Sequence, residues 1–147
     1  MRAVYRVLAM LIAIGVVVQA ATVAWGWFAV LHDTDSGAVY DKNSGDNAGQ
    51  AMHSVVGMMV LPTIAVLLLI VAFFARIPGG VKWAAITLGV TVLQVLLAEL
   101  ATGAPVVGAL HGINAFVIAF AASLAMRQAR LAGKDTPAEP AAPAAAG

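Results

Sequence analysis

Four apolar runs, each close to the length that crosses a bilayer as a helix, dominate this chain. They cover roughly residues 7–31, 52–75, 83–102 and 106–126. A hydrocarbon core is crossed by about 20 apolar residues in helical form. Because lipid offers the backbone no hydrogen-bond partners, each run must satisfy its own polar groups, as a helix does. The pattern predicts an all-α protein, a four-helix transmembrane bundle with up-and-down topology.

Composition supports this class and excludes several functions. The 147 residues are 62% hydrophobic and only 10% charged, whereas soluble domains are about 25% charged. The main partner is therefore the lipid bilayer. A formal net charge of +1 argues against a nucleic-acid partner, which requires a concentrated basic surface. Without cysteine there is no disulfide, thiolate metal site or thioether-linked haem, so any cofactor depends on nitrogen or oxygen ligands.

The chain is predicted to form one domain followed by a tail. Residues 1–131 contain the four apolar runs, and residues 132–147 are rich in alanine and proline. Such a segment has too few bulky apolar side chains to form a core. We expect a disordered cytoplasmic tail over residues 132–147.

Basic residues predict the orientation in the membrane. They flank the runs on one side: Arg2, Arg6, Arg76, Lys82, Arg127, Arg130 and Lys134. Positively charged flanks remain in the cytoplasm. Both termini are therefore predicted to be cytoplasmic in a multi-pass plasma-membrane protein, with the 32–50 connection and the turn at 102–105 outside.

Two similar heptapeptides each place a histidine inside an apolar run. Residues 51–57 read Ala-Met-His-Ser-Val-Val-Gly and residues 109–115 read Ala-Leu-His-Gly-Ile-Asn-Ala. An ionisable side chain inside a membrane segment is a functional-site hypothesis by default. The match also indicates that the second hairpin repeats the first, with Gln19 answered by Gln94. Chance similarity between two alanine- and valine-rich segments is the alternative.

The two histidines suggest a haem site. In a sequential up-and-down bundle the second and fourth helices lie on a diagonal, about 14 Å apart when neighbouring axes are ~10 Å apart. Two imidazoles that bind one iron from opposite faces need backbones separated by on the order of 13 Å. We therefore predict haem b with His53 and His111 as its metal ligands. Gly57, Gly112 and Ala115 would leave room for the ring.

The same polar residues have a purely structural interpretation. Glu99 is expected at the height of His111, and Gln94 at the height of Asn114, so they could form hydrogen bonds between helices or support a ligating histidine. Gln19 has the corresponding place in the first helix. A proton or ion path through His111 is a third interpretation.

One spacing opposes the haem interpretation. His53 lies 23 residues before Arg76 (76 − 53) and His111 lies 16 residues before Arg127 (127 − 111). If these arginines mark one membrane boundary, the histidines differ in height by seven residues, about 10 Å of helix.

The chain also resembles known families. Its two Ala-X-His-X-X-X-small motifs are similar to those in the histidine-bearing four-helix halves of haem A synthase and in b-type cytochrome membrane subunits, where paired histidines hold haem. Residues 58–62, 73–84 and 108–115 resemble a family of small bacterial four-helix membrane proteins of unknown function. The first resemblance implies haem, and the second implies the architecture and a bacterial membrane.

Two functions of different classes follow from these patterns. One is a haem b-binding membrane protein with an electron-transfer role toward the outer leaflet. The other is a cofactor-free accessory or interaction protein in which the polar residues fasten helices together. The sequence leaves open an enzymatic role, a redox partner or quinone, and a homo-oligomer.

Overall fold

The computed structural model describes residues 1–134, which form an all-helical bundle. In chain order the elements are α1 (Arg2–Asp35), α2 (Ala48–Val55), the π-helical turn η1 (Val56–Val60), α3 (Leu61–Ala75), α4 (Gly80–Gly103) and α5 (Val107–Lys134). Because α2, η1 and α3 form one continuous span, the described residues contain four helices long and apolar enough to cross a membrane. The predicted class and the number of helices are confirmed.

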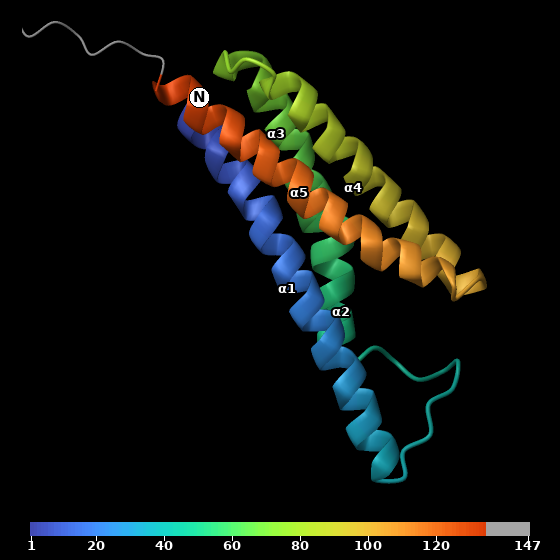
Figure 1. The fold of residues 1–147 in the computed structure, drawn as a ribbon. Coiled ribbons are helices and arrows are strands. Elements are labelled where there is room, and N and C mark those ends of the chain that lie inside the picture. Colours follow the sequence, from blue (N-terminus) through green and yellow to red (C-terminus); the bar gives the residue numbers. More distant parts are fainter. Residues whose placement is uncertain (135–147) are drawn as a thin grey trace, which may run out of the picture.

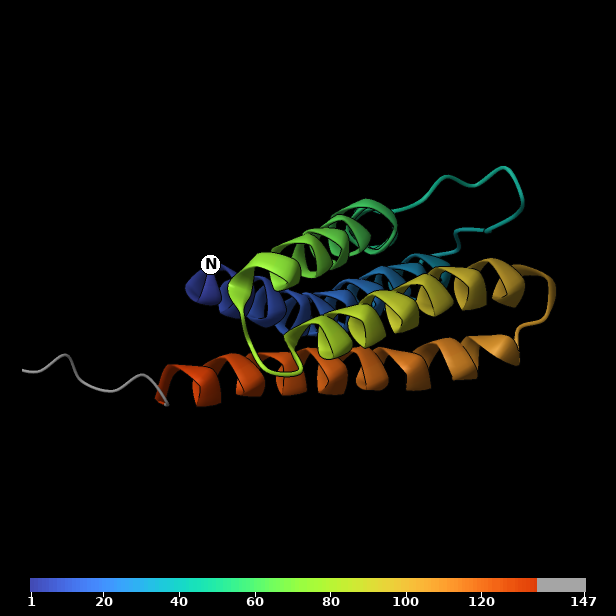
Figure 2. The ribbon, with the colours of Figure 1, turned by 90° about the horizontal axis from the view of Figure 1, so that it is seen from above.

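The helices pack in an up-and-down ring. The α1 helix contacts α2, α3 and α5, and α4 contacts α3 and α5. Consequently the α2–α3 span and α5 lie on one diagonal, as the sequence predicts. Figure 2 shows the N-terminus, the connection between α3 and α4 and the end of α5 at the same end of the bundle. We call this the terminal end, and the opposite one, with the 36–47 connection and the turn before α5, the loop end.

All four spans are longer than their apolar runs. The second span begins at Ala48, four residues before the predicted start, because Asn47 and Gln50 form a reciprocal capping box. The first helix continues to Asp35. The last continues to Lys134, so residues 132–134 are helical rather than part of a tail, and the rest of the predicted tail lies outside the described residues.

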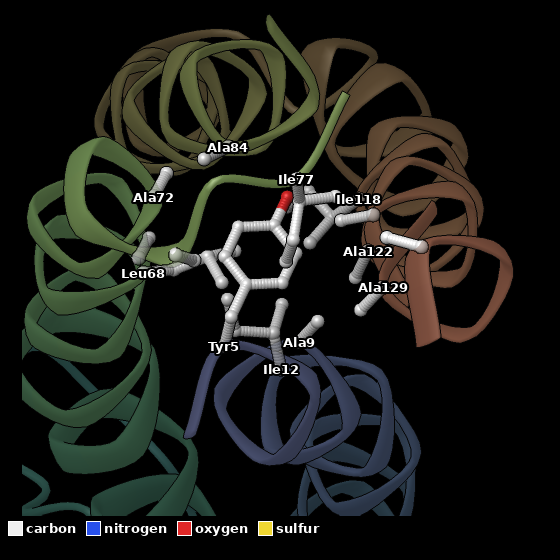
Figure 3. Packing of buried hydrophobic residues seen from close by; sticks show 14 residues of the cluster. Tyr5, Ala9, Ile12, Leu68, Ala72, Ile77, Ala84, Ile118, Ala122 and Ala129 are labelled. Atoms are coloured by element: carbon white, nitrogen blue, oxygen red, sulfur yellow. The ribbon is translucent and has the colours of Figure 1, made fainter. Parts of the chain in front are cut away.

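Alanines and a few larger side chains fill the core at the terminal end (Figure 3). Tyr5 is fully buried there, and its hydroxyl donates to the Gly80 carbonyl oxygen at 2.8 Å. Much of the remaining core is alanine from all four spans, as at Ala9, Ala72 and Ala122. Alanine lets helix backbones approach closely, which is how membrane helices gain packing energy without a hydrophobic driving force. The terminal end is therefore tightly closed.

The helices separate toward the loop end. Figure 1 shows the α4–α5 hairpin diverging from α1 and α2 as it leaves the terminal end. The α1 and α2 helices remain in contact with each other because Gly26 and Gly49 face each other with no side chain between them. A Cβ added to Gly49 would lie 2.6 Å from the Gly26 Cα. The divergence leaves a cavity between the two helix pairs.

Candidate functional site

The cavity between the diverging helix pairs has a volume of about 490 Å³ and is lined by all four spans. Cavities of on the order of 300–1,000 Å³ are typical of small-molecule and cofactor sites. Most of the lining is apolar. The polar lining residues are Gln19, His53, Ser54, Thr91, Gln94, Glu99, Thr102 and His111. Both histidines of the heptapeptides therefore line one cavity.

His53 is half-buried and is oriented by α1. Its Nδ1 lies 3.1 Å from the Gln19 carbonyl oxygen. Because a carbonyl only accepts, Nδ1 carries the proton and Nε2 keeps its lone pair. Within residues 1–134 that Nε2 has no hydrogen-bond partner. His53 lies inside the helix and not at its start, because α2 begins five residues earlier, at Ala48.

The Gln19 side chain forms a hydrogen bond with the backbone of His53. Its Nε2 donates to the His53 carbonyl oxygen at 3.0 Å. Gly57 makes this possible, since a Cβ at that position would lie 2.5 Å from Gln19 Nε2. The sequence suggested that Gly57 leaves room for a macrocycle. The structure shows that it lines the cavity and also admits the Gln19 amide.

A π-helical turn follows His53 directly. In η1 the Leu61 N–H bonds to the Val56 carbonyl oxygen, five residues back instead of four. Pro62 explains the change, because it has no N–H to give to the Met58 carbonyl and its ring would collide with that oxygen in a regular helix. The Thr63 hydroxyl donates to the Met59 carbonyl at 2.6 Å. Such single π turns are often found at functional sites.

His111 is held by α4. Its Nδ1 lies 3.1 Å from the Gln94 carbonyl oxygen and its Nε2 lies 3.1 Å from Gln94 Nε2. Asn114 Nδ2 donates to Gln94 Oε1 at 2.7 Å and to the Val90 carbonyl at 2.8 Å. The asparagine thereby fixes the glutamine oxygen as an acceptor, so Gln94 Nε2 donates to His111 Nε2 and His111 carries its proton on Nδ1.

The two imidazoles lie close together although their helices are diagonal. Their ring centroids are 6.3 Å apart and their planes are inclined by 57°. The height mismatch expected from the arginines is therefore absent. Its cause is that α5 does not end at Arg127 but continues seven residues further, to Lys134 (134 − 127). Counted from the helix ends, the histidines lie 22 and 23 residues away (75 − 53 and 134 − 111).

The contacts of the two halves correspond. In each hairpin the histidine Nδ1 lies 3.1 Å from the backbone carbonyl oxygen of a glutamine. The pairs are His53 with Gln19 and His111 with Gln94. This correspondence favours an internal repeat over chance similarity between the heptapeptides. The two glutamine side chains differ, since one reaches a backbone oxygen and the other reaches the ring.

Other predicted residues take different places. Glu99 lines the cavity but forms no hydrogen bond with His111, whose partner is Gln94. The reason is helical geometry. Glu99 follows Gln94 by five residues, which turn the helix by about 140° and advance it by about 7.5 Å. Gly112 and Ala115 both line the cavity. Sequence reasoning missed Ser54 and Thr102, whose hydroxyl-bearing side chains also line it.

The site is not a metal centre built from protein ligands alone. Among the described residues there is no group of three or more His, Cys, Asp or Glu side chains that could hold a metal ion. An axially ligated porphyrin needs only two protein ligands, because the macrocycle supplies the other four. The donor set present is two imidazoles with their Nδ1 protons held by backbone carbonyls, which is the usual support of ligating histidines.

Comparison with known proteins gives a family without an assigned function. Residues 45–103 match the sequence model of a family described as a family of unknown function (DUF6220). That segment contains His53, the π turn and Gln94, while His111 lies beyond it. No curated protein and no solved structure matches the chain. The chain is a multi-pass helical membrane protein similar to this family over that segment.

Proposed function

We propose that the cavity binds one haem b, with His53 and His111 as its two axial ligands, and that the protein transfers electrons. The observation that carries the proposal is the spacing of the rings. A metal–imidazole bond is about 2.0–2.1 Å, and a ring nitrogen lies about 1.1 Å from its centroid, so two imidazoles on one metal have centroids about 6.2–6.4 Å apart. The distance between His53 and His111 is 6.3 Å.

Hydrogen bonds to the histidines support the same proposal. Both Nδ1 atoms donate to backbone carbonyls, which fixes the tautomer and leaves Nε2 as the nitrogen that could bind a metal, at His111 after its bond to Gln94 Nε2 is released. The small residues Gly57, Gly112 and Ala115 lie in the lining, where they keep the cavity open beside the rings. When bound, haem supplies a one-electron iron couple whose potential depends on such ligands and on burial.

The lining of the cavity contains no lysine or arginine. A haem b carries two propionates, and of the lining hydroxyl groups that of Ser54 could donate to them, because the Thr102 hydroxyl donates to the Glu99 carbonyl oxygen at 2.7 Å. Affinity must therefore come mainly from the two histidines and from apolar contact. Loss of one histidine should cost more than the roughly 10- to 100-fold that loss of an outer hydrogen-bond partner costs at a metal site.

The proposal includes a location. The basic residues Arg2, Arg127 and Arg130 belong to the terminal end, and positive flanks favour the cytoplasmic side. In a bacterial plasma membrane the cavity would then lie toward the outer leaflet. The electron partner would be a protein or a quinone at that side.

A second candidate is a cofactor-free accessory protein. It is favoured by the Asn114–Gln94–His111 network, in which both ring nitrogens of His111 are already paired. In that function the network fastens α4 to α5 and His111 has no ligand to bind.

Titration of the purified protein with haem separates the two. The proposal predicts a saturable Soret band at one haem per chain, greatly weakened in His53→Ala and in His111→Ala. His32→Ala is the matched control, because that histidine lies on α1 outside the cavity lining. A spectrum that either histidine variant leaves unchanged would overturn haem ligation and leave the accessory function.

A further inference from the structure

The two histidines of the cavity are held unequally. His53 Nε2 has no hydrogen-bond partner among residues 1–134, whereas His111 Nε2 accepts from the Gln94 side chain at 3.1 Å. A nitrogen whose lone pair accepts a hydrogen bond must give it up before it can bind a metal. The Gln94 amide therefore competes with a metal for His111 Nε2, whereas no group among the described residues competes for His53 Nε2.

The helix backbone is also packed more tightly around His53 than around His111. The helix around His53 is clamped on both sides, because Gly49 packs on the Gly26 backbone one turn earlier and Gly57 packs on Gln19 one turn later. Around His111 the packing is open. A Cβ added to Gly112 would meet no atom within 4 Å, and one added to Gly108 would only touch Ala101, at 3.9 Å. The backbone around His111 is therefore less tightly packed than the backbone around His53.

We infer that His111 is an exchangeable ligand, with Gln94 as the positioning residue that sets the exchange, and that a small neutral diatomic molecule can take its place in the cavity. This inference rests on the proposed function. The exchange is a ligand substitution with no net transfer of electrons or protons. With haem bound, His111 Nε2 would leave the metal and accept the Gln94 N–H again, and the diatomic molecule would take the freed position.

Asn114 strengthens this competition. It is nearly fully buried, and its bond to Gln94 Oε1 keeps the glutamine amide turned with its N–H toward His111. Steric access and hydrogen-bond donors beside a haem decide which small ligands bind it. The Gln94 amide supplies such a donor on the His111 side alone, because the Gln19 amide is engaged with the His53 carbonyl.

Carbon monoxide is the probe for the test. Haem-loaded, reduced protein is titrated with it, and the affinity is compared with that of Gln94→Met, which keeps the length of the side chain but removes the donor. A hydrogen bond of the size measured between membrane helices changes an equilibrium by roughly 3- to 20-fold. We expect Gln94→Met to lower the affinity for carbon monoxide by that factor. Ser123→Ala, which removes only a bond to its own helix, is the control and should change nothing.

A second measurement uses the haem-free protein. With ¹⁵N-labelled histidine, the Nε2 resonance of His111 should report an accepted hydrogen bond that disappears in Gln94→Met, while that of His53 stays unchanged. Haem binding with no effect of Gln94→Met on carbon monoxide affinity would overturn this inference alone. An unchanged His111 resonance would do the same. Failure to bind haem at all would overturn the proposed function, and this inference with it.

Discussion

The imidazoles of His53 and His111 face one cavity with their centroids 6.3 Å apart, although the two residues belong to helices on opposite corners of the bundle. Two features make this approach possible. The glycine pair of α1 and α2 brings His53 toward α1, and the extension of α5 to Lys134 brings His111 to the same height.

Gly57→Ala should displace the Gln19 side chain. The added Cβ would lie 2.5 Å from Gln19 Nε2, so the bond to the His53 carbonyl must lengthen or break. Hydrogen bonds between membrane helices average about 0.6 kcal/mol and reach about 1.7 kcal/mol, and we expect a loss of stability in that range. The measurement is unfolding in mixed micelles with Gln19→Ala as the second variant of a double-mutant cycle. Additive effects of the two substitutions would contradict the contact.

Gly49→Ala should be more damaging. Its Cβ would lie 2.6 Å from the Gly26 Cα and 2.9 Å from the Thr22 carbonyl oxygen, and backbone atoms cannot move aside as a flexible side chain can. We expect a loss of about 1–3 kcal/mol, typical of overpacking, measured by the same unfolding assay. Gly89→Ala is the matched control, since a Cβ there meets nothing within 4 Å. Equal stability of both variants would show that α1 and α2 do not cross at these glycines.

Tyr5→Phe tests whether the terminal end is independent of the cavity. The substitution leaves the buried Gly80 carbonyl without its 2.8 Å partner, at a cost of about 1–2 kcal/mol. Tyr40→Phe, which loses a 2.7 Å bond to Asp33 in the exposed connection, should cost less. Haem titration of Tyr5→Phe should give the wild-type affinity. A large fall in affinity would instead show that the terminal core and the cavity are coupled.

The 36–47 connection should respond to acid through Asp41. The backbone N–H of Asn43, first among several donors, holds the pKa of this carboxyl below its usual 3.8. Because the pKa in the folded state is depressed, the turn gains stability above the ordinary value and loses it as the pH falls through the folded pKa. An NMR titration should give the Asp41 carboxyl a pKa below 3.8, and the Asn43 amide signal should shift over the same pH range. Titration at or above 3.8 would show that the turn does not form.

Much of the arrangement follows from the sequence because a few physical rules determine it. Apolar length predicts four spans, and alternation across the membrane places the second and fourth on a diagonal. The heptapeptides identify His53 and His111 as candidate site residues, and the repeat that they indicate pairs Gln19 with Gln94. Gln94 and Asn114 were expected at one height, and the 2.7 Å bond between them confirms it.

Other features depend on details that patterns do not carry. Arg127 indicates a membrane boundary but not the end of a helix, so counting from the arginines gave a height difference that the structure does not have. Pro62 removes one backbone donor, but whether the helix then bends or forms a π turn depends on neighbouring contacts. The partner of His111 depends on which face of α4 is turned toward α5. Glu99 and Gln94 are five residues apart, so they lie on different faces of that helix.

Electron paramagnetic resonance of the oxidised, haem-loaded protein labelled with ¹⁵N-histidine tests the central claim most directly. If His53 and His111 bind one iron, the wild type and His32→Ala will show a low-spin ferric signal with hyperfine coupling to two histidine nitrogens, and each single variant, His53→Ala or His111→Ala, will retain coupling to one. A high-spin signal in the wild type, or one without histidine coupling, would contradict the claim.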